Sequence, residues 1–206
     1  MVRLPLFPLP VVLFPGASMP LHIFEPRYRS MVARCLETDR RFGLIYHDAD
    51  EQGPFMNEAG RVGCVAEIDR YQPLPDGRSL IRIRGVHRFR IIEGLDDSPE
   101  PWYEATVAPY EDIVHPRAEA IRTVRDRTLR LLLEVLQTLP EPPDEVPCFA
   151  LDRDLSYQLA PLVQIDGRWH QSLLELRDET YRLERLDAVF QAGVDRTAPD
   201  EEEGAA

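Results

Sequence analysis

The residues able to do covalent chemistry are few in this sequence, and none stands in a recognised catalytic spacing. The 206 residues include 24 basic side chains, all of them Arg, and no Lys. A chain without Lys cannot form a Schiff base, a Ser–Lys dyad or the phosphate-binding site of a P-loop. A nucleophile elbow needs G-x-S-x-G, and Gly16-Ala-Ser18-Met-Pro20 lacks the second glycine. We therefore expect no catalytic residue and no enzymatic activity.

The residue types that bind metals are scattered along the chain. Histidines occur without H-x-H or H-x-x-x-H spacing, at His22, His47, His87, His115 and His170. The odd number of cysteines and the absence of C-x-x-C indicate buried free thiols in a reducing compartment, at Cys35, Cys64 and Cys148. We predict no metal site, no cofactor and a cytoplasmic location.

Charge and hydropathy argue against nucleic acid and membranes as partners. The chain has 36 acidic residues and a net charge of −12, a sign that disfavours nonspecific attraction to nucleic acid or anionic lipid. The apolar run from Leu4 to Phe14 is cut by Pro5, Pro8 and Pro10, which would break a signal-peptide core or a membrane helix. No 18-residue apolar run occurs elsewhere.

Alternating and turn-bounded runs predict a β-rich domain over residues 1–112. We expect one short helix over residues 27–36, with Pro26 near its first turn. Prolines would confine the N-terminal apolar run to a sheet edge, and Gly85 predicts a bulge or sharp bend. Strands are expected over residues 11–14, 19–24, 42–46, 62–71, 80–93 and 102–110. This pattern predicts an α+β protein that contains a small antiparallel barrel.

The pattern changes to a helical period near Pro116, which predicts a helical subdomain over residues 113–192. Helices are expected over residues 116–139, 151–165 and 168–191, with Gly193 as the stop of the last one. The remaining residues, 193–206, include Asp200-Glu-Glu-Glu203 and almost nothing apolar. We predict that they form a disordered acidic tail.

Four arginines share one parity of the strand expected over residues 80–93, namely Arg82, Arg84, Arg88 and Arg90. Such a row could bind phosphates or carboxylates bidentately, as an anion site. Alternatively, the row is a solvated sheet face that pairs with Glu67 and Asp69 across the strands. An RNA-binding barrel would place aromatic side chains on the same face, whereas Phe89 has the opposite parity.

The N-terminal apolar segment could be a covering edge strand or one side of a groove. A groove with apolar pockets beside free backbone groups would suit an extended peptide. We expect Phe24 to be the most core-like of the candidates, because a bulky aromatic in a strand usually points inward. The candidate peptide contacts are Phe14, His22, Phe24, Glu25, Arg27 and Tyr28.

Two N-terminal motifs resemble the opening of the substrate-binding domain of Lon proteases: Leu4-Pro-Leu-Phe-Pro-Leu-Pro-Val-Val-Leu-Phe-Pro-Gly16 and Met19-Pro-Leu-His-Ile-Phe-Glu-Pro-Arg-Tyr-Arg29. The middle strands of that domain are similar to Val62-Gly-Cys-Val-Ala-Glu-Ile68, Leu74-Pro-Asp-Gly-Arg78 and Arg84-Gly-Val-His-Arg-Phe-Arg90. Its helical part is similar to Ser156-Tyr-Gln-Leu-Ala160 and Arg182-Leu-Glu-Arg-Leu186. The resemblance covers residues 3–192.

The resemblance implies a PUA-like pseudo-barrel of about six strands followed by a helical bundle. It also implies binding to unfolded or extended polypeptide, in substrate recognition or as an adaptor of a protease complex. Because the sequence lacks the ATPase and Ser–Lys motifs of a full Lon protease, it is most similar to stand-alone, non-catalytic members. The alternative is a PUA-like binder of RNA or of a small molecule, and the net charge of −12 disfavours RNA. No oligomeric state is predicted.

Overall fold

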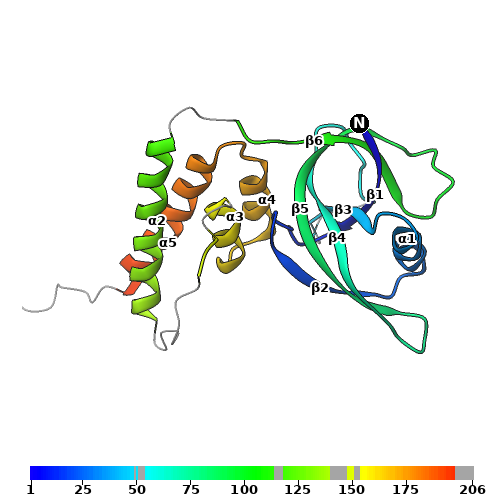
Figure 1. Ribbon diagram of the computed structural model, residues 1–206, viewed down its shortest axis with the longest axis horizontal. Coiled ribbons are helices and arrows are strands. Elements are labelled where there is room, and N and C mark those ends of the chain that lie inside the picture. The colour runs from blue at the N-terminus through cyan, green and yellow to red at the C-terminus, as the bar shows by residue number, and fades with distance from the viewer. Residues whose placement is uncertain (49, 51–53, 114–117, 140–147, 151–153, 198–206) are drawn as a thin grey trace, which may run out of the picture. The chain divides into compact units, whose positions relative to one another are not determined.

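The chain forms two compact units in the computed structural model, which describes residues 1–48, 50, 54–113, 118–139, 148–150 and 154–197. Unit 1 comprises residues 1–112 and 164–177, and unit 2 comprises residues 113–163 and those from 178 onward. Figure 1 shows strands in unit 1 and helices alone in unit 2. The sequence predicts one helical domain over residues 113–192, so the assignment of residues 164–177 to unit 1 is a correction.

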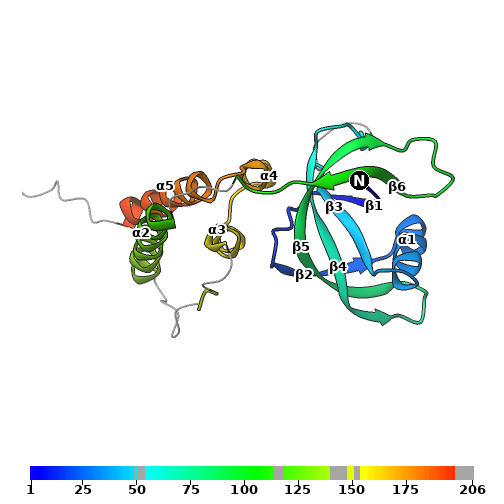
Figure 2. The ribbon, with the colours of Figure 1, turned by 45° about the horizontal axis from the view of Figure 1, so that its top comes forward.

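Unit 1 is built on one six-stranded sheet. Its order is β2-β5-β4-β3-β1-β6, and β5 also pairs with β6. Five strands therefore close on themselves, as Figure 2 shows, while β2, among the residues that the structure describes, pairs with β5 alone. The strands are β1 (Val2–Leu9), β2 (Ser18–Ile23), β3 (Arg41–Tyr46), β4 (Val62–Pro73), β5 (Ser79–Gly94) and β6 (Tyr103–Pro109).

The long strand β5 makes this topology possible, and Gly85 marks its turning point. Residues 79–84 of β5 pair with β2, whereas residues 89–94 pair with β6. A Cβ atom at Gly85 would lie 2.2 Å from the carbonyl oxygen of Phe14, so only glycine fits this close approach. The β4–β5 register shifts between Cys64 and Ala66, whose partners are Arg88 and Gly85. The bulge predicted near Gly85 is thus confirmed.

The N-terminal strand differs from the prediction in its residue range and in its place within the sheet. Residues 11–14 form no strand, and β1 lies earlier, inside the sheet rather than at its edge. Residues 2–6 of β1 pair with β6, and residues 6–9 pair with β3 in parallel, so the sheet is mixed rather than antiparallel. Each half of β1 pairs with one neighbouring strand and leaves its other side unpaired. Pro5 and Pro8, which have no N–H to donate, can therefore each turn their nitrogen to the unpaired side without losing a ladder hydrogen bond.

The helix α1 (Pro26–Leu36) covers one opening of the sheet and confirms the helix expected at this position. Pro26 occupies its first turn, where a missing N–H costs no hydrogen bond. The helix buries Tyr28, Met31, Val32 and Cys35 against a core that includes residues of the strands β1 to β5 on one face of the sheet. Burying an apolar side chain of this size contributes about 1.5–3 kcal/mol.

The helix predicted over residues 168–191 is two helices, α4 (Gly167–Glu175) in unit 1 and α5 (Glu179–Thr197) in unit 2. The backbone is extended at Leu176, with ψ of 128°. Asp178 then accepts a hydrogen bond from the Thr180 amide at 2.8 Å, which satisfies a free donor at the start of α5. The break therefore has a local cap as well as a partner in unit 1, described below.

Unit 2 contains α2 (Ala118–Thr138), α3 (Leu155–Leu159), a 3-10 turn (Ala160–Leu162) and α5. The helix expected over residues 151–165 is thus shorter, and residues 151–153 and 114–117, including His115 and Pro116, lie outside the described part. The predicted stop at Gly193 is wrong, because α5 continues to Thr197. A Cβ at Gly193 would lie 3.4 Å from Val135 of α2, an ordinary contact distance, so the packing does not require glycine there. Of the predicted tail, residues 193–197 are helical and residues 198–206 lie outside the description.

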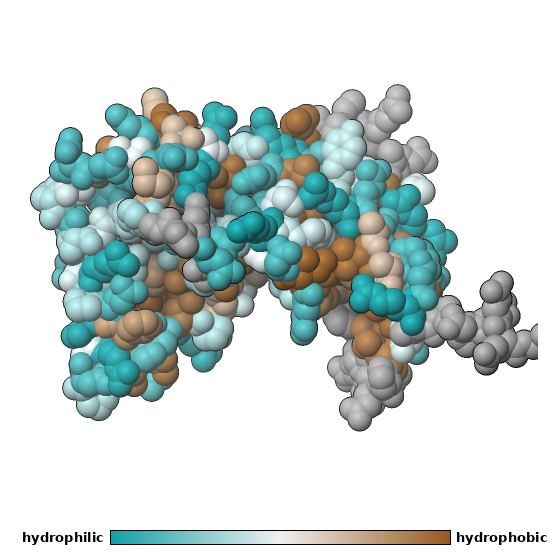
Figure 3. Space-filling view, turned by 180° about the vertical axis from the view of Figure 1, so that it is seen from behind, coloured by the Kyte–Doolittle hydropathy of each residue, from teal (hydrophilic) through white to brown (hydrophobic). Residues whose placement is uncertain are grey.

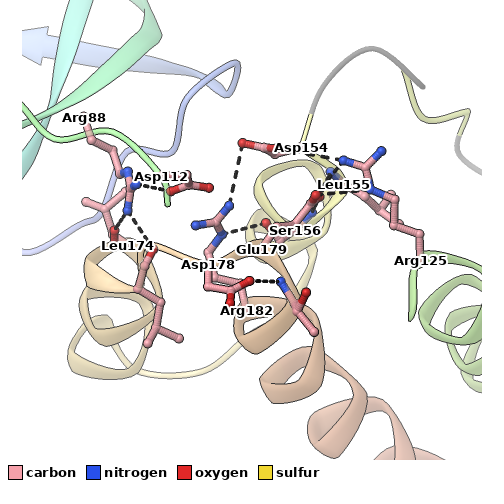
Figure 4. Close-up of polar contacts among 12 residues, drawn as sticks. Arg88, Asp112, Arg125, Asp154, Leu155, Ser156, Leu174, Asp178, Glu179 and Arg182 are labelled. Carbon is pink, nitrogen blue, oxygen red and sulfur yellow. Dashed lines mark hydrogen bonds and ion pairs between the residues drawn. The ribbon is translucent and has the colours of Figure 1, made fainter. Parts of the chain in front are cut away.

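A buried polar network joins the helices of unit 2 (Figure 4). One carboxylate oxygen of Glu179 accepts from the Leu155 amide at 2.6 Å, and the other accepts from Arg125 at 2.5 Å. The buried Arg182 donates to the Ser156 hydroxyl at 2.8 Å. Glu179 of α5 thereby satisfies free amides of α3, a helix of five residues that could not persist alone, and Arg125 of α2 neutralises its carboxylate.

Candidate peptide-binding surface

Two of the six candidate contact residues belong to the core rather than to a surface. Phe14 and Tyr28 are each 2% exposed. The Tyr28 ring stacks on Phe7 with centroids 4.0 Å apart, and burial raises the pKa of its hydroxyl to about 12. Neither side chain can contact a partner without rearrangement of the core.

Phe24 is 58% exposed, which overturns the expectation that it is core-like. The preceding residue, Ile23, occupies the inward position at the end of β2 and is 1% exposed. Because successive side chains in an extended segment point to opposite sides, Phe24 is directed outward. Its ring centroid lies 5.7 Å from that of His22, which is also exposed. The two rings therefore form an aromatic pair that is accessible to solvent.

Glu25 and Arg27 define the turn between this pair and α1. Glu25 is the N-terminal cap residue of α1 and has an extended backbone. Its carboxylate accepts from Arg27 Nε at 3.0 Å, and both side chains are 41% exposed. The Arg27 guanidinium also lies 4.6 Å from the centre of the Tyr28 ring. This ion pair lies at the first turn of α1, next in sequence to the exposed rings.

Neighbouring strands add residues that the sequence analysis did not select. In the β2–β5 ladder, His22 is opposite Leu80 and Pro20 is opposite Arg82. A depression of about 470 Å³ is lined by Pro20, Arg70, Tyr71, Gln72, Leu80, Ile81 and Arg82. The parity of β5 already places Leu80 on the outer face, so this residue was detectable from the pattern. We call Pro20, His22, Phe24 and Leu80 the β2 surface.

The β2 surface is bordered by paired charges. Arg82 donates to Asp69 at 2.8 Å, and Arg84 donates to Glu67 at 3.1 Å, which confirms the predicted cross-strand pairs. The hydrogen bond from Arg82 lowers the pKa of Asp69. Hydrogen bonds from Arg41 and Arg84 lower the pKa of Glu67. Seen from behind, unit 1 also presents small groups of apolar side chains surrounded by polar ones (Figure 3).

The four arginines of β5 do not share one environment. Arg88 is buried, and its guanidinium donates to the carbonyl oxygens of Leu174 and Leu176 at 2.6 and 2.7 Å and to the carboxylate of Asp112. Figure 4 shows this side chain directed at the C-terminal end of α4, whose carbonyls it satisfies. Arg90 is exposed. The predicted continuous row is therefore interrupted.

A family model of the substrate-binding domain of the ATP-dependent protease La (Lon) matches residues 3–187. The chain belongs to this family. Lon proteases from Cytophaga hutchinsonii and Herpetosiphon aurantiacus are each 28% identical to it over 200 residues, which cover 91% and 94% of this chain. The chain spans 24% of the length of either relative.

Solved structures support the same assignment for this Lon substrate-binding domain. The crystal structure of a Lon N-terminal domain protein from Xanthomonas campestris is 28% identical, with a TM-score of 0.62 over 91% of this chain and 98% of that one. The N-terminal domain of a Mycobacterium avium complex Lon protease has a TM-score of 0.65 at 17% identity, over 97% of this chain and all of that one. The α+β architecture of this chain, with its six-stranded sheet, matches the structures of these domains.

Within the ranges that the structure describes, no group of three or more His, Cys, Asp or Glu side chains could hold a metal ion. No helix in the same ranges combines the length and apolar character needed to cross a membrane. The thiols of Cys35 and Cys64 are buried, whereas Cys148 is exposed, contrary to the prediction for that residue.

Proposed function

We propose that this Lon substrate-binding domain binds unfolded or extended polypeptide through the β2 surface, without catalysing a reaction. The observation that carries the proposal is the exposed aromatic pair of His22 and Phe24 beside Leu80 on the adjacent strand. Exposed aromatic and aliphatic side chains gathered in one place are typical of recognition sites for apolar segments. The family's description as a substrate-binding domain supports the same class of ligand.

The proposal extends to the fold and to partners. We infer that the closed part of the sheet is a PUA-like pseudo-barrel and that the helices of unit 2 form its accompanying bundle. We also propose a role in substrate recognition or as an adaptor for a protease complex in the cytoplasm, and the family's description as a substrate-binding domain supports the recognition role. The paired Arg82 and Arg84 offer little free charge to a phosphate backbone, so we place RNA binding below polypeptide binding.

A small-molecule ligand is the second candidate, on the strength of a separate depression in unit 1. Its volume is about 490 Å³, and Arg3, Arg34, Arg41, Trp102 and Glu104 are among its lining residues. All three of those guanidinium groups already have carboxylate partners, because Arg3 pairs with Glu104, Arg34 with Glu37 and Arg41 with Glu67. A ligand would have to displace these contacts, so we rank this site second.

Binding to fluorescently labelled β-casein, an unfolded protein, tests the proposed function by fluorescence anisotropy. We predict that Phe24→Ala weakens binding by about 1–3 kcal/mol, because truncating a central aromatic contact has an effect of that size. Tyr181→Ala in unit 2 is the matched control, since Tyr181 is 59% and Phe24 58% exposed. Equal affinities for wild type and both variants would place the binding surface elsewhere, and no binding by wild type would refute the function.

A further inference from the structure

The strand β2 leaves one of its two edges unpaired. Within the described residues, β2 stands at the end of the strand order and hydrogen bonds to β5 alone. Figure 1 shows it along the margin of unit 1. Ser18, Pro20 and His22 are exposed. An edge of this kind presents backbone donors and acceptors that another extended chain can use.

Two hydrogen bonds identify the backbone groups that point outward. Gly16 N–H donates to the Gly85 carbonyl at 2.8 Å, and Gly85 N–H donates to the Ala17 carbonyl at 2.9 Å. Successive residues of a strand direct their N–H and C=O groups to opposite edges, and Ser18 is paired with Arg84 directly after this contact. The backbone groups of Ser18, Pro20 and His22 therefore face the free edge, and Pro20 contributes only its carbonyl.

One face of β2 is apolar up to this edge, and the other carries Ser18, Pro20 and the ring of His22. Met19 and Leu21 are half-buried and pack against the main core, which they extend to the margin of the sheet. Pro20 and His22 lie on the other face, and Phe24 continues their line. An added strand would bury the exposed flanks of Met19 and Leu21 on one side and of Phe24 on the other.

We propose that an extended segment of the bound polypeptide pairs with the free edge of β2 as an additional strand. The proposal rests on the proposed function and states how the polypeptide is held. Backbone hydrogen bonds to Ser18, Pro20 and His22 supply affinity that is independent of sequence, and alternate side chains contact Phe24 or Met19 and Leu21. The expected ligand is a segment with apolar residues at alternate positions and no proline opposite His22.

A second copy of this chain fits the edge poorly. A symmetric antiparallel pair of β2 strands centred on Pro20 would set two prolines against each other. Neither could donate an N–H, so both central carbonyls would remain unpaired, at an unfavourable free energy. The net charge of −12 adds repulsion between copies. A different chain with an ordinary amide opposite Pro20 forms the central hydrogen bond.

Paired substitutions at His22 separate its side chain from its backbone donor. His22→Ala removes the ring alone, whereas His22→Pro also removes the outward N–H and leaves the ladder to β5 intact. Pro20 in the same strand shows that proline is accommodated at an outward position. We expect His22→Pro to bind labelled β-casein about tenfold more weakly than His22→Ala, the effect of one lost hydrogen bond. Ser18→Pro and Ser18→Ala repeat the comparison at a second outward amide.

Amide hydrogen exchange of the wild-type chain gives an independent measurement. Saturating β-casein should slow the exchange of the Ser18 and His22 amides, while the amides of Met19 and Leu21 are already protected by β5. Casein binding without new protection at Ser18 and His22, and with equal affinities for the Pro and Ala variants, would overturn strand addition and leave the proposed function standing. Self-association in sedimentation experiments that His22→Pro abolishes would overturn it in favour of a second copy. Absence of casein binding in wild type would refute both proposals.

Discussion

One buried guanidinium group, that of Arg88, accounts for a departure from the simple pattern of the sequence. Arg88 has the parity of the exposed Arg82 and Arg84, yet it is buried because α4 places two terminal carbonyls within hydrogen-bonding distance. A charge in such a position is stable only while its partners remain. The side chain therefore contributes to the position of α4 on unit 1 rather than to an anion site.

We predict that Arg88→Met destabilises unit 1 by about 2–4 kcal/mol, because Asp112 and two carbonyls lose their donor. Arg90→Met, at an exposed position of the same strand, should change stability by less than about 0.5 kcal/mol. Urea unfolding followed by tryptophan fluorescence measures the difference, since Trp102 and Trp169 both belong to unit 1. Similar midpoints for the two variants would contradict this role of Arg88.

The cysteines should differ sharply in reactivity. Burial raises the pKa of the Cys35 and Cys64 thiols to about 12, and Cys148 is exposed. At about pH 8 iodoacetamide should therefore modify Cys148 alone in the folded chain, because the thiolate is the reactive form. Intact-mass spectrometry should show one adduct before unfolding and three after it. Two or three adducts on the native chain would mean that unit 1 opens readily.

At the scale of elements, two glycines illustrate opposite uses of a missing side chain. Gly85 lets β5 pass the backbone of Phe14 and change its partner from β2 to β6. Gly193 lies within α5 at a normal helical position and contacts Val135 with space for a methyl group. The first is required by the topology of the sheet, whereas the second merely weakens its helix.

We predict that Gly85→Ala destabilises unit 1 by at least about 2 kcal/mol, since its Cβ would overlap a carbonyl oxygen. Gly193→Ala should stabilise unit 2 by about 0.5–1 kcal/mol, the usual gain in helix propensity. Thermal unfolding followed by tryptophan fluorescence for unit 1 and by circular dichroism at the helix band for unit 2 provides the measurement. Destabilisation by both variants would show that α2 and α5 tolerate no added atom.

At the scale of the whole molecule, the net charge is −12, yet many of the individual charges are paired. Glu67 receives hydrogen bonds from Arg41 and Arg84, and these lower its pKa below the ordinary value. Its ionised form is thus favoured in the folded chain. The resulting stability is present above the ordinary carboxyl pKa of about 4.3 and is lost as the pH falls through the lower folded-state value.

Glu67→Gln should therefore destabilise unit 1 at about pH 6 and have a smaller effect at about pH 3, where wild-type Glu67 approaches its own neutral form. Unfolding by urea at both pH values measures the two differences. Glu58→Gln, at an exposed position for which the structure shows no ion pair, serves as the control. A difference between wild type and Glu67→Gln that stays constant or grows toward acid would contradict the assigned sign.

The sequence determined those features that depend on neighbours along the chain. The apolar stripe and Pro26 specify α1, alternation specifies β4 and β5, and apolar runs bounded by turns specify β3 and β6. The pairs of Glu67 and Asp69 with arginines followed from strand parity. The N-terminal motifs also identified the Lon substrate-binding family, because a family resemblance is carried by the order of residue types along the chain and needs no tertiary structure to be recognised.

Only the tertiary structure decided features that depend on distant partners. The internal place of β1 follows from β3 and β6, which flank different halves of it. The orientation of Phe24 depends on which face of β2 the core covers, and a shift of one residue would reverse it. The burial of Arg88 and the break between α4 and α5 require contact across 86 residues of sequence. No local pattern contains that information, because the partner groups are brought together only when the chain folds.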